Sequence, residues 1–436
     1  MGIVLKFFKW VFILLLVAIL IAVAWPWNVV VKERLTAGPF KEYLEQNVQR
    51  IDLNDPADQM NFEADFYNSK LIIVGEVHGA QKAQDFDLMM MKHLNERMGV
   101  RWLMAELSYV QAERFNAYLD TGDETFLEPV FSRWLASATQ WGNQQHYEKI
   151  KALRAYNLTL PENRRLRYFG VDLIGKSERP DAANWLAGML EDLPADAPEA
   201  LIGLREAASS VEDDAFIEAA KAALAANTED WVGLGIDVPG VRYLVRNLML
   251  SLEDASRYTA IIPNVEAMVR EFGIGQDEPV YGFWGLFHSM KAVVNDTARP
   301  LALRLSESDL PFADGVTTLL MLYTDSMMNM PSRALPEFLQ SGGPYTDMSM
   351  SQDNPYLLYT YGIGDMRHVA GGADAAIFSL YTDDSPYSNS KRLRQTTGIL
   401  PKLQRLELTP PDQSPSEYAV LINGSPALTP YVGQGD

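Results

Sequence analysis

A glutamate and a histidine stand two residues apart between two glycines, in the string Gly75-Glu76-Val77-His78-Gly79. In an extended segment residues two apart project from the same side, so the Glu76 and His78 side chains are expected to lie together. An imidazole titrates near neutral pH and can take a proton from water, and a neighbouring carboxylate stabilises the imidazolium that forms. This short string therefore predicts a site that activates water.

Three further ionisable residues come at or soon after the ends of apolar runs that are typical of strands: Glu106, Asp172 and His288. The carboxyl ends of parallel strands meet at one edge of a sheet, where open α/β sheets bind their ligands. We predict that the catalytic residues gather there, with Asp172 as a neighbour that fixes a histidine tautomer. The predicted catalytic residues are Glu76, His78, Glu106 and His288.

The same four residues are candidate metal ligands. Two histidines and two carboxylates, without a thiolate, suit manganese, iron, cobalt or zinc. Water bound to such a metal becomes a nucleophile near neutral pH. The chain has no cysteine, which excludes disulfides, thiolate nucleophiles and thiolate-bound metals. The pattern leaves metal-free and metal-assisted chemistry both open.

The elements that position these residues follow from the periodicity of the apolar side chains. Between the first two strands, apolar residues four apart from Phe86 to Met98 predict a helix that ends at Gly99. Alternating strands and helices predict an α/β fold, with a mainly parallel sheet flanked by helices, over residues 70–407. The predicted strands cover residues 71–74, 100–105, 166–171, 279–285, 316–323 and 373–381.

Other segments surround or interrupt this domain. Residues 28–69 are predicted to form a linker and a lead-in helix, which is helical in period over 40–51. Residues 180–275 are rich in alanine and acidic residues and predict a helical insertion. Residues 408–436 contain several prolines and predict a tail.

The amino-terminal residues 1–27 are predicted to form a transmembrane anchor or a signal segment. The apolar run 7–25 is flanked by aromatic residues and preceded by Lys6, with Lys9 inside it. Small residues near its end also fit a cleavable signal peptide. Both alternatives export the domain, and the anchor predicts a single-pass membrane protein with its catalytic domain outside the cytoplasm, on the periplasmic side in a bacterium.

The composition restricts the partners. The 436 residues carry a formal net charge of −20, which argues against a broad nucleic-acid surface because that would need basic patches. The expected partners are therefore a small-molecule or peptide substrate, and the membrane through the amino-terminal helix.

The glycine-flanked string resembles the Gly-Glu-x-His motif of the erythromycin esterase, ChaN-like and Tiki/TraB superfamily. The erythromycin esterase branch is the most similar, although its members often have one more residue between the glutamate and the histidine. Similar stretches extend the resemblance over roughly residues 68–385, at 98–106, 153–157, 169–173, 284–288 and 373–381.

The resemblance implies a hydrolase that acts on an ester, a lactone or an amide. His78 would be the general base, Glu76 and Glu106 would orient it, and His288 would polarise the substrate carbonyl or protonate the leaving group. ChaN-like relatives imply haem or iron binding at these residues instead, and Tiki-like relatives imply a metal-dependent protease.

Overall fold

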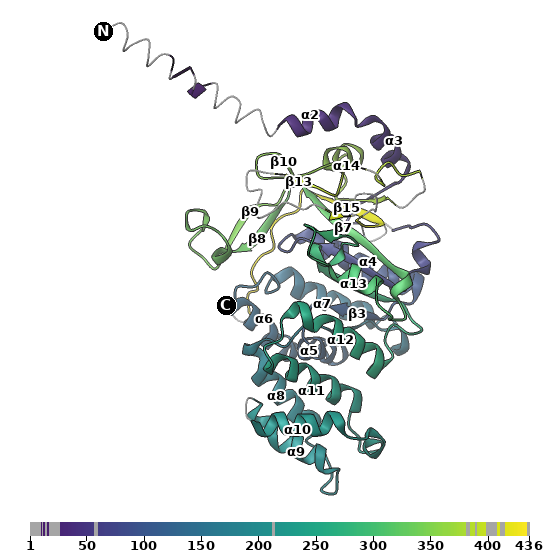
Figure 1. Ribbon diagram of the computed structural model, residues 1–436, viewed down its shortest axis with the longest axis vertical. Helices are drawn as coiled ribbons and strands as arrows, with labels where there is room; N and C mark the ends of the chain where they lie inside the picture. The colour runs from purple at the N-terminus through teal and green to yellow at the C-terminus, as the bar shows by residue number, and fades with distance from the viewer. Residues whose placement is uncertain are drawn as a thin grey trace, which may run out of the picture.

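The computed structural model describes residues 27–433, with gaps at 56–59, 212–213, 381–383, 389, 398–407 and 410–414, and also residues 10, 12, 13, 15 and 16. A sheet with its flanking helices occupies the middle of the molecule (Figure 1). A group of helices from residues 179–272 extends from it toward one end.

The structure does not support the predicted membrane anchor. A helix that crosses a bilayer needs about 20 consecutive apolar residues. Within the described residues no helix is both long enough and apolar enough for this, and α2 (Trp27–Leu35) has only 9 residues. The run 7–25, on which the predicted transmembrane helix rested, lies mostly outside the described residues. The N-terminal transmembrane helix, the membrane partner and the single-pass location are therefore not supported.

The main sheet is mixed. Its strands, in spatial order, are β1 (Val48–Ile51), β12 (Ala375–Ser379), β15 (Tyr418–Asn423), β7 (Val316–Thr324), β2 (Leu71–Glu76), β5 (Val280–Gly285), β3 (Trp102–Ala105) and β4 (Arg167–Gly170). The pairs from β15 to β4 are all parallel, whereas β12 runs antiparallel to both of its neighbours. The sheet was predicted to be mainly parallel, and it differs from this prediction at the β12 side. Antiparallel strands there can be joined without a crossover helix.

Helices cover both faces of the sheet. Before β4 come α4 (Gln81–Met98), α5 (Tyr109–Thr121), α6 (Glu128–Ala136) and α7 (Gln144–Asn157). After β4 come α8 (Arg179–Met189), α9 (Glu199–Ala207), α10 (Asp214–Ala225), α11 (Val238–Leu252) and α12 (Arg257–Phe272), and α13 (Leu301–Ser306) follows β5. The helices α8 to α12 occupy the stretch predicted as a helical insertion, and α9 and α10 lie at the lower end of the molecule in Figure 1.

The strand β2 shows how the sequence builds two cores. All of its residues are buried, and successive side chains of a strand point to opposite faces. Ile72 and Val74 belong to the core that α4 and α7 cover, and Leu71 and Ile73 belong to the core that the helices α8 to α12 cover. A continuous apolar run is therefore what this central parallel strand requires.

The remaining elements surround the β12 side of the sheet and its carboxyl edge. They are α3 (Gly38–Gln46), α14 (Ile363–Ala370), the hairpin of β8 (Met327–Pro331) and β9 (Tyr345–Ser349), and three shorter pairings. These pairings join β10 (Asp353–Asn354), β11 (Leu358–Thr360) and β13 (Thr396–Thr397), and β6 (Val293–Val294) with β14 (Leu408–Thr409).

Two predicted segments differ from the structure. The lead-in helix ends at Gln46, and residues 48–51 form the edge strand β1 instead of continuing the helix. The segment predicted as a Pro-rich tail contains β15, which pairs with β12 and β7 inside the main sheet. Its apolar stretch 419–422 is short and lies near prolines, so the composition of this segment does not indicate a buried strand.

If β15 is a core strand, a charge in it should unfold the protein. Val420 is fully buried, whereas Val432 is 65% exposed. We expect Val420→Asp to lower the free energy of unfolding by about 3 kcal/mol or more, because the carboxylate has no partner in the core. The matched control Val432→Asp should change it by less than about 0.5 kcal/mol. Urea denaturation followed by circular dichroism measures both, and equal tolerance of the two variants would contradict this role of β15.

Candidate active site

The carboxyl ends of adjacent parallel strands bring the predicted residues to one edge of the sheet. Glu76 is the last residue of β2, and Glu106 directly follows β3. Asp172 comes soon after β4, and His288 lies in the short helix η7 (Leu286–Ser289) that directly follows β5. The strand order β2-β5-β3-β4 makes these strands neighbours, although β5 comes last of the four in the sequence.

Glu76 and His78 contact each other directly. His78 Nδ1 lies 2.6 Å from Glu76 Oε1, and the Glu76 side chain is 6% exposed against 24% for His78. A carboxylate accepts hydrogen bonds, so Nδ1 is the donor and Nε2 takes no part in this contact. A Cβ atom at Gly285 would lie 3.1 Å from His78 Nε2. Glycine at this position therefore keeps the free nitrogen uncovered.

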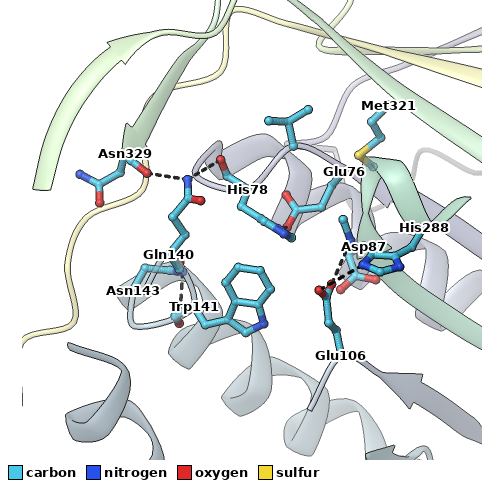
Figure 2. A network of polar contacts seen from close by, with 12 residues as sticks. Glu76, His78, Asp87, Glu106, Gln140, Trp141, Asn143, His288, Met321 and Asn329 are labelled. Atoms are coloured by element: carbon cyan, nitrogen blue, oxygen red, sulfur yellow. Dashed lines mark hydrogen bonds and ion pairs between the residues drawn. The ribbon is translucent and has the colours of Figure 1, made fainter. Parts of the chain in front are cut away.

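The turn that carries His78 is held by hydrogen bonds. Gly79 has a φ of +105°, a conformation that favours glycine. Its carbonyl oxygen accepts from the backbone N–H of Asn329 at 3.0 Å and of Leu428 at 2.8 Å. Gln140 Nε2 donates to the carbonyl oxygens of His78 and Asn329, at 2.9 Å each (Figure 2). The loop after α6 and the strand β8 thus fix the histidine from two sides.

Glu106 is the second buried carboxylate of the site. Its Oε2 accepts the backbone N–H of Gly285 at 3.0 Å. Its Oε1 contacts the Arg257 guanidinium and lies 3.8 Å from His288 Nε2. A buried carboxylate needs such partners to remain charged. Glu106 therefore links the residues after β5 to a cation from the helical insertion.

Asp172 has an arginine as its partner where the sequence predicted a histidine. Arg257 Nε lies 2.8 and 2.6 Å from the two carboxylate oxygens of Asp172, while Arg257 Nη2 contacts Glu106. Arg257 is the first residue of α12, so one side chain joins the helical insertion to two strand ends. Asp172 thus orients a guanidinium, which corrects its predicted role of fixing a histidine tautomer.

Burial and charge shift the pKa values of the two histidines in opposite directions. Burial by itself lowers the pKa of His78, but the charge and hydrogen bond of Glu76 and the charge of Glu106 outweigh it, so this pKa lies above 6.5. Burial lowers the pKa of His288 below 6.5, and the charge of Glu106 offsets this only in part. Near neutral pH His288 is therefore mainly neutral, and His78 is the stronger base of the two.

The two acids beside Arg257 also differ. Burial raises the pKa of Glu106, but His78, Arg257 and His288 together outweigh burial and hold this pKa below 4.5. Burial raises the pKa of Asp172 above 3.8, and Arg257 reverses only part of that rise. Glu106 is consequently the more firmly ionised carboxylate of this pair.

The arrangement does not fit a divalent metal bound by the four predicted residues. The guanidinium of Arg257 already contacts Glu106 Oε1, so a metal cation bound to that oxygen would lie beside a like charge, which repels it. Glu76 Oε1 already accepts from His78. Across the described residues, no group of three or more histidine, aspartate or glutamate side chains has the geometry to hold a metal ion. The haem alternative stays a prediction.

Three residues of the site were not predicted from the sequence. Arg257 lies 151 positions from Glu106, inside a helical stretch whose local pattern gives no sign of such a contact. The ring of Trp141 lies 3.9 Å from the His78 ring, centroid to centroid, with the two ring planes tilted by 58°. Gln140, its neighbour, supports the His78 turn. A polar loop rich in Gln, Trp and Asn before α7 was the only available signal for these two residues.

Two other histidines lie apart from these contacts. His93, on α4, is hydrogen-bonded to the Tyr67 hydroxyl at 3.1 Å, and burial together with Arg97 lowers its pKa to about 4. His368 is exposed on α14. These positions are consistent with structural or surface roles.

Comparison with known proteins supports the architecture. No protein-family model and no curated protein matches the sequence. A Bacillus cereus protein from a structural-genomics programme superposes with a TM-score of 0.65 at 14% identity, covering 91% of this chain and 99% of that one. A succinoglycan biosynthesis protein gives 0.61 at 14% identity, covering 90% and 98% of the two chains.

The erythromycin esterase EreC, a histidine-to-asparagine mutant in its open conformation, gives a TM-score of 0.53 at 14% identity and covers 85% of this chain and 93% of that one. The fold resembles that of an erythromycin esterase. This confirms the resemblance predicted from the Glu76–His78 string. At this identity the likeness concerns the fold alone.

The contacts of Arg257 predict a pH-dependent loss of stability when it is removed. Arg257→Met leaves Glu106 and Asp172 without their shared cation, which we expect to cost about 1–2 kcal/mol at pH 7 after allowance for the half-exposed guanidinium. Arg257 lowers the pKa of both carboxyls, so its contribution is complete while both are ionised. The part due to Glu106, whose pKa lies below 4.5, should be lost as the pH falls through that lowered pKa, and the part due to Asp172, whose pKa stays above 3.8, should begin to shrink at a higher pH relative to its unfolded value.

Thermal unfolding at several pH values measures this difference. Arg270→Met is the control, since Arg270 lies on the same helix with 51% of its side chain exposed, against 46% for Arg257, and pairs with its neighbour Glu271. A loss of stability that is equal in the two variants, or constant with pH, would contradict the role of Arg257 as the shared counter-charge of Glu106 and Asp172.

Proposed function

We propose that this protein is a metal-independent hydrolase that uses His78 as a general base to activate water against an ester, lactone or amide. The observation that carries the proposal is the 2.6 Å contact between His78 Nδ1 and Glu76 Oε1, which leaves His78 Nε2 free at the edge of the sheet. A carboxylate in this position fixes the tautomer and stabilises the imidazolium. The fold of an esterase-named neighbour supports the same chemical class.

The reaction begins with a proton transfer. His78 Nε2 takes a proton from water, and the resulting hydroxide adds to the substrate carbonyl carbon while the carbonyl oxygen becomes negative. The tetrahedral intermediate then collapses, the bond to the leaving group breaks, and His78 returns its proton to the leaving oxygen or nitrogen. The products are an acid and an alcohol or amine, and the enzyme is regenerated.

His288 supplies the second polar contact in this proposal. Its lowered pKa keeps the imidazole neutral near pH 7, so that an N–H can donate to the carbonyl oxygen as charge develops there. Arg257, paired with Glu106 and Asp172, adds a fixed positive charge beside the same edge. Trp141 borders His78 and offers an apolar surface to the substrate.

Replacement of the base should abolish hydrolysis. We expect His78→Gln to lower kcat/KM by about 10²–10⁴, the usual contribution of a general base. A panel of chromogenic esters and amides measures this with the full chain. His368→Gln replaces an exposed histidine on α14 and should retain full activity. Activity on the panel that is equal in both variants would reject His78 as the base.

The pH dependence should report the Glu76–His78 contact. A general base works only when neutral, so kcat/KM should fall as the pH drops through the His78 pKa, above 6.5. Glu76 raises that pKa and burial lowers it, so Glu76→Gln should move the acid limb to lower pH and reduce the maximal rate. An acid limb that stays in place in Glu76→Gln would show that another group controls the profile.

A further inference from the structure

Glu76 and His78 line a cavity of about 60 Å³. The part of its lining that comes from α4, α7 and the strands β4 and β5, which we call the inner chamber, is rich in polar side chains. These residues are Gln84, Asp87, His146, Lys149, Tyr168 and Tyr281, and they line the same cavity as Glu76.

Asp87 and Lys149 form an ion pair within the inner chamber. Asp87 is fully buried, and its Oδ2 lies 2.5 Å from Lys149 Nζ. The hydroxyl of Tyr281 donates to Asp87 Oδ1 at 2.7 Å. Because Lys149 is already bound by Asp87, its ammonium is not a counter-charge reserved for Glu76.

Three other polar atoms of the cavity have no protein partner. They are Glu76 Oε2, Gln84 Oε1 and the Tyr168 hydroxyl, in side chains of residues that are 6%, 6% and 4% exposed. Buried polar atoms of native proteins are almost always hydrogen-bonded. The first two atoms only accept, and the hydroxyl can donate. A matching ligand must therefore donate at least two hydrogen bonds and accept one.

Water has this set of donors and acceptors. The cavity is large enough for water, since one water needs only about 10–15 Å³ of space of this kind. We propose that the inner chamber holds an ordered water cluster that donates to Glu76 Oε2 and is itself held by Gln84 and Tyr168. These two become positioning residues for the Glu76–His78 pair. Their catalytic meaning rests on the proposed function, whereas the water site itself does not.

The groups that face Glu76 explain why the cluster matters. Four groups, each from a different part of the chain, face Glu76: His78 after β2, Asp87 on α4, Tyr281 on β5 and Tyr323 on β7. Burial raises the pKa of both tyrosines well above the usual value, so they stay neutral. When His78 is also neutral and ready to act, Glu76 is a buried anion with one protein donor. The waters supply the missing donors in that state.

Loss of the waters therefore has a predictable sign. Without them the state with neutral His78 and charged Glu76 becomes less stable, whereas the state with a His78 imidazolium has no net charge and suffers less. His78 should then hold its proton to higher pH. This shift is opposite to the one expected for Glu76→Gln, so the two causes can be separated.

The test is a proton NMR titration of the His78 ring in the full chain, with the signal assigned by its loss in His78→Gln. We expect Tyr168→Phe and Gln84→Met each to raise the pKa of His78 by about one pH unit. The control is Tyr118→Phe, because Tyr118 is 4% exposed like Tyr168, belongs to the same core and does not line the chamber. It should leave the titration unchanged.

A high-resolution crystal structure of the full chain gives the second readout, and we expect water within hydrogen-bonding distance of Glu76 Oε2. A dry chamber, or an unchanged His78 titration in the folded variants, would overturn the proposal. Two variants are used because either one alone could fail to fold. Neither readout needs turnover, so a wet chamber with shifted titrations but no hydrolysis of any ester would reject only the proposed function.

Discussion

The contact between the Glu76 carboxylate and the His78 imidazole constrains the rest of this site. Glu76 ends an entirely buried strand, where a carboxylate is strongly unfavourable without a partner. His78 lies two residues further along the chain, in a turn where Gly79 has a positive φ and which Gln140 and the backbone of Asn329 hold in place. A strand end, a loop and a hairpin thus cooperate to hold one ion pair.

The second carboxylate, Glu106, is stabilised in a different way. Its counter-charge comes from Arg257, at the start of α12, and the same guanidinium also binds Asp172. The helices that follow β4 are therefore tied to the sheet edge by charge as well as by apolar packing. The same guanidinium disfavours a metal cation at Glu106, because like charges repel.

The sequence predicted what depends on local pattern and missed what depends on distant contacts. The strands β2, β3, β4 and β5 follow from short apolar runs, and the rule that ligands bind at carboxyl ends then brings Glu76, Glu106 and His288 to one edge. Nothing local marks Arg257, because its partners are two acids far away in the sequence. The strand β15 was missed because six residues near prolines resemble a tail, and only pairing with β7 and β12 makes them a core strand.

The pKa values of His78 and His288 differ because the carboxylate beside each ring has a different set of other partners. Glu76 Oε1 accepts a hydrogen bond from His78 at 2.6 Å, so the Glu76 carboxylate directly stabilises the protonated form of this imidazole. Glu106 is divided between Arg257, a backbone N–H and His288, which is 3.8 Å away, so too little remains to offset the burial of that ring. Burial and Arg257 lower the pKa of both rings, and only His78 has a hydrogen-bonded carboxylate whose effect outweighs them. One edge of the sheet therefore carries a stronger base and a mainly neutral histidine, the pairing that the proposed attack of water on a carbonyl requires.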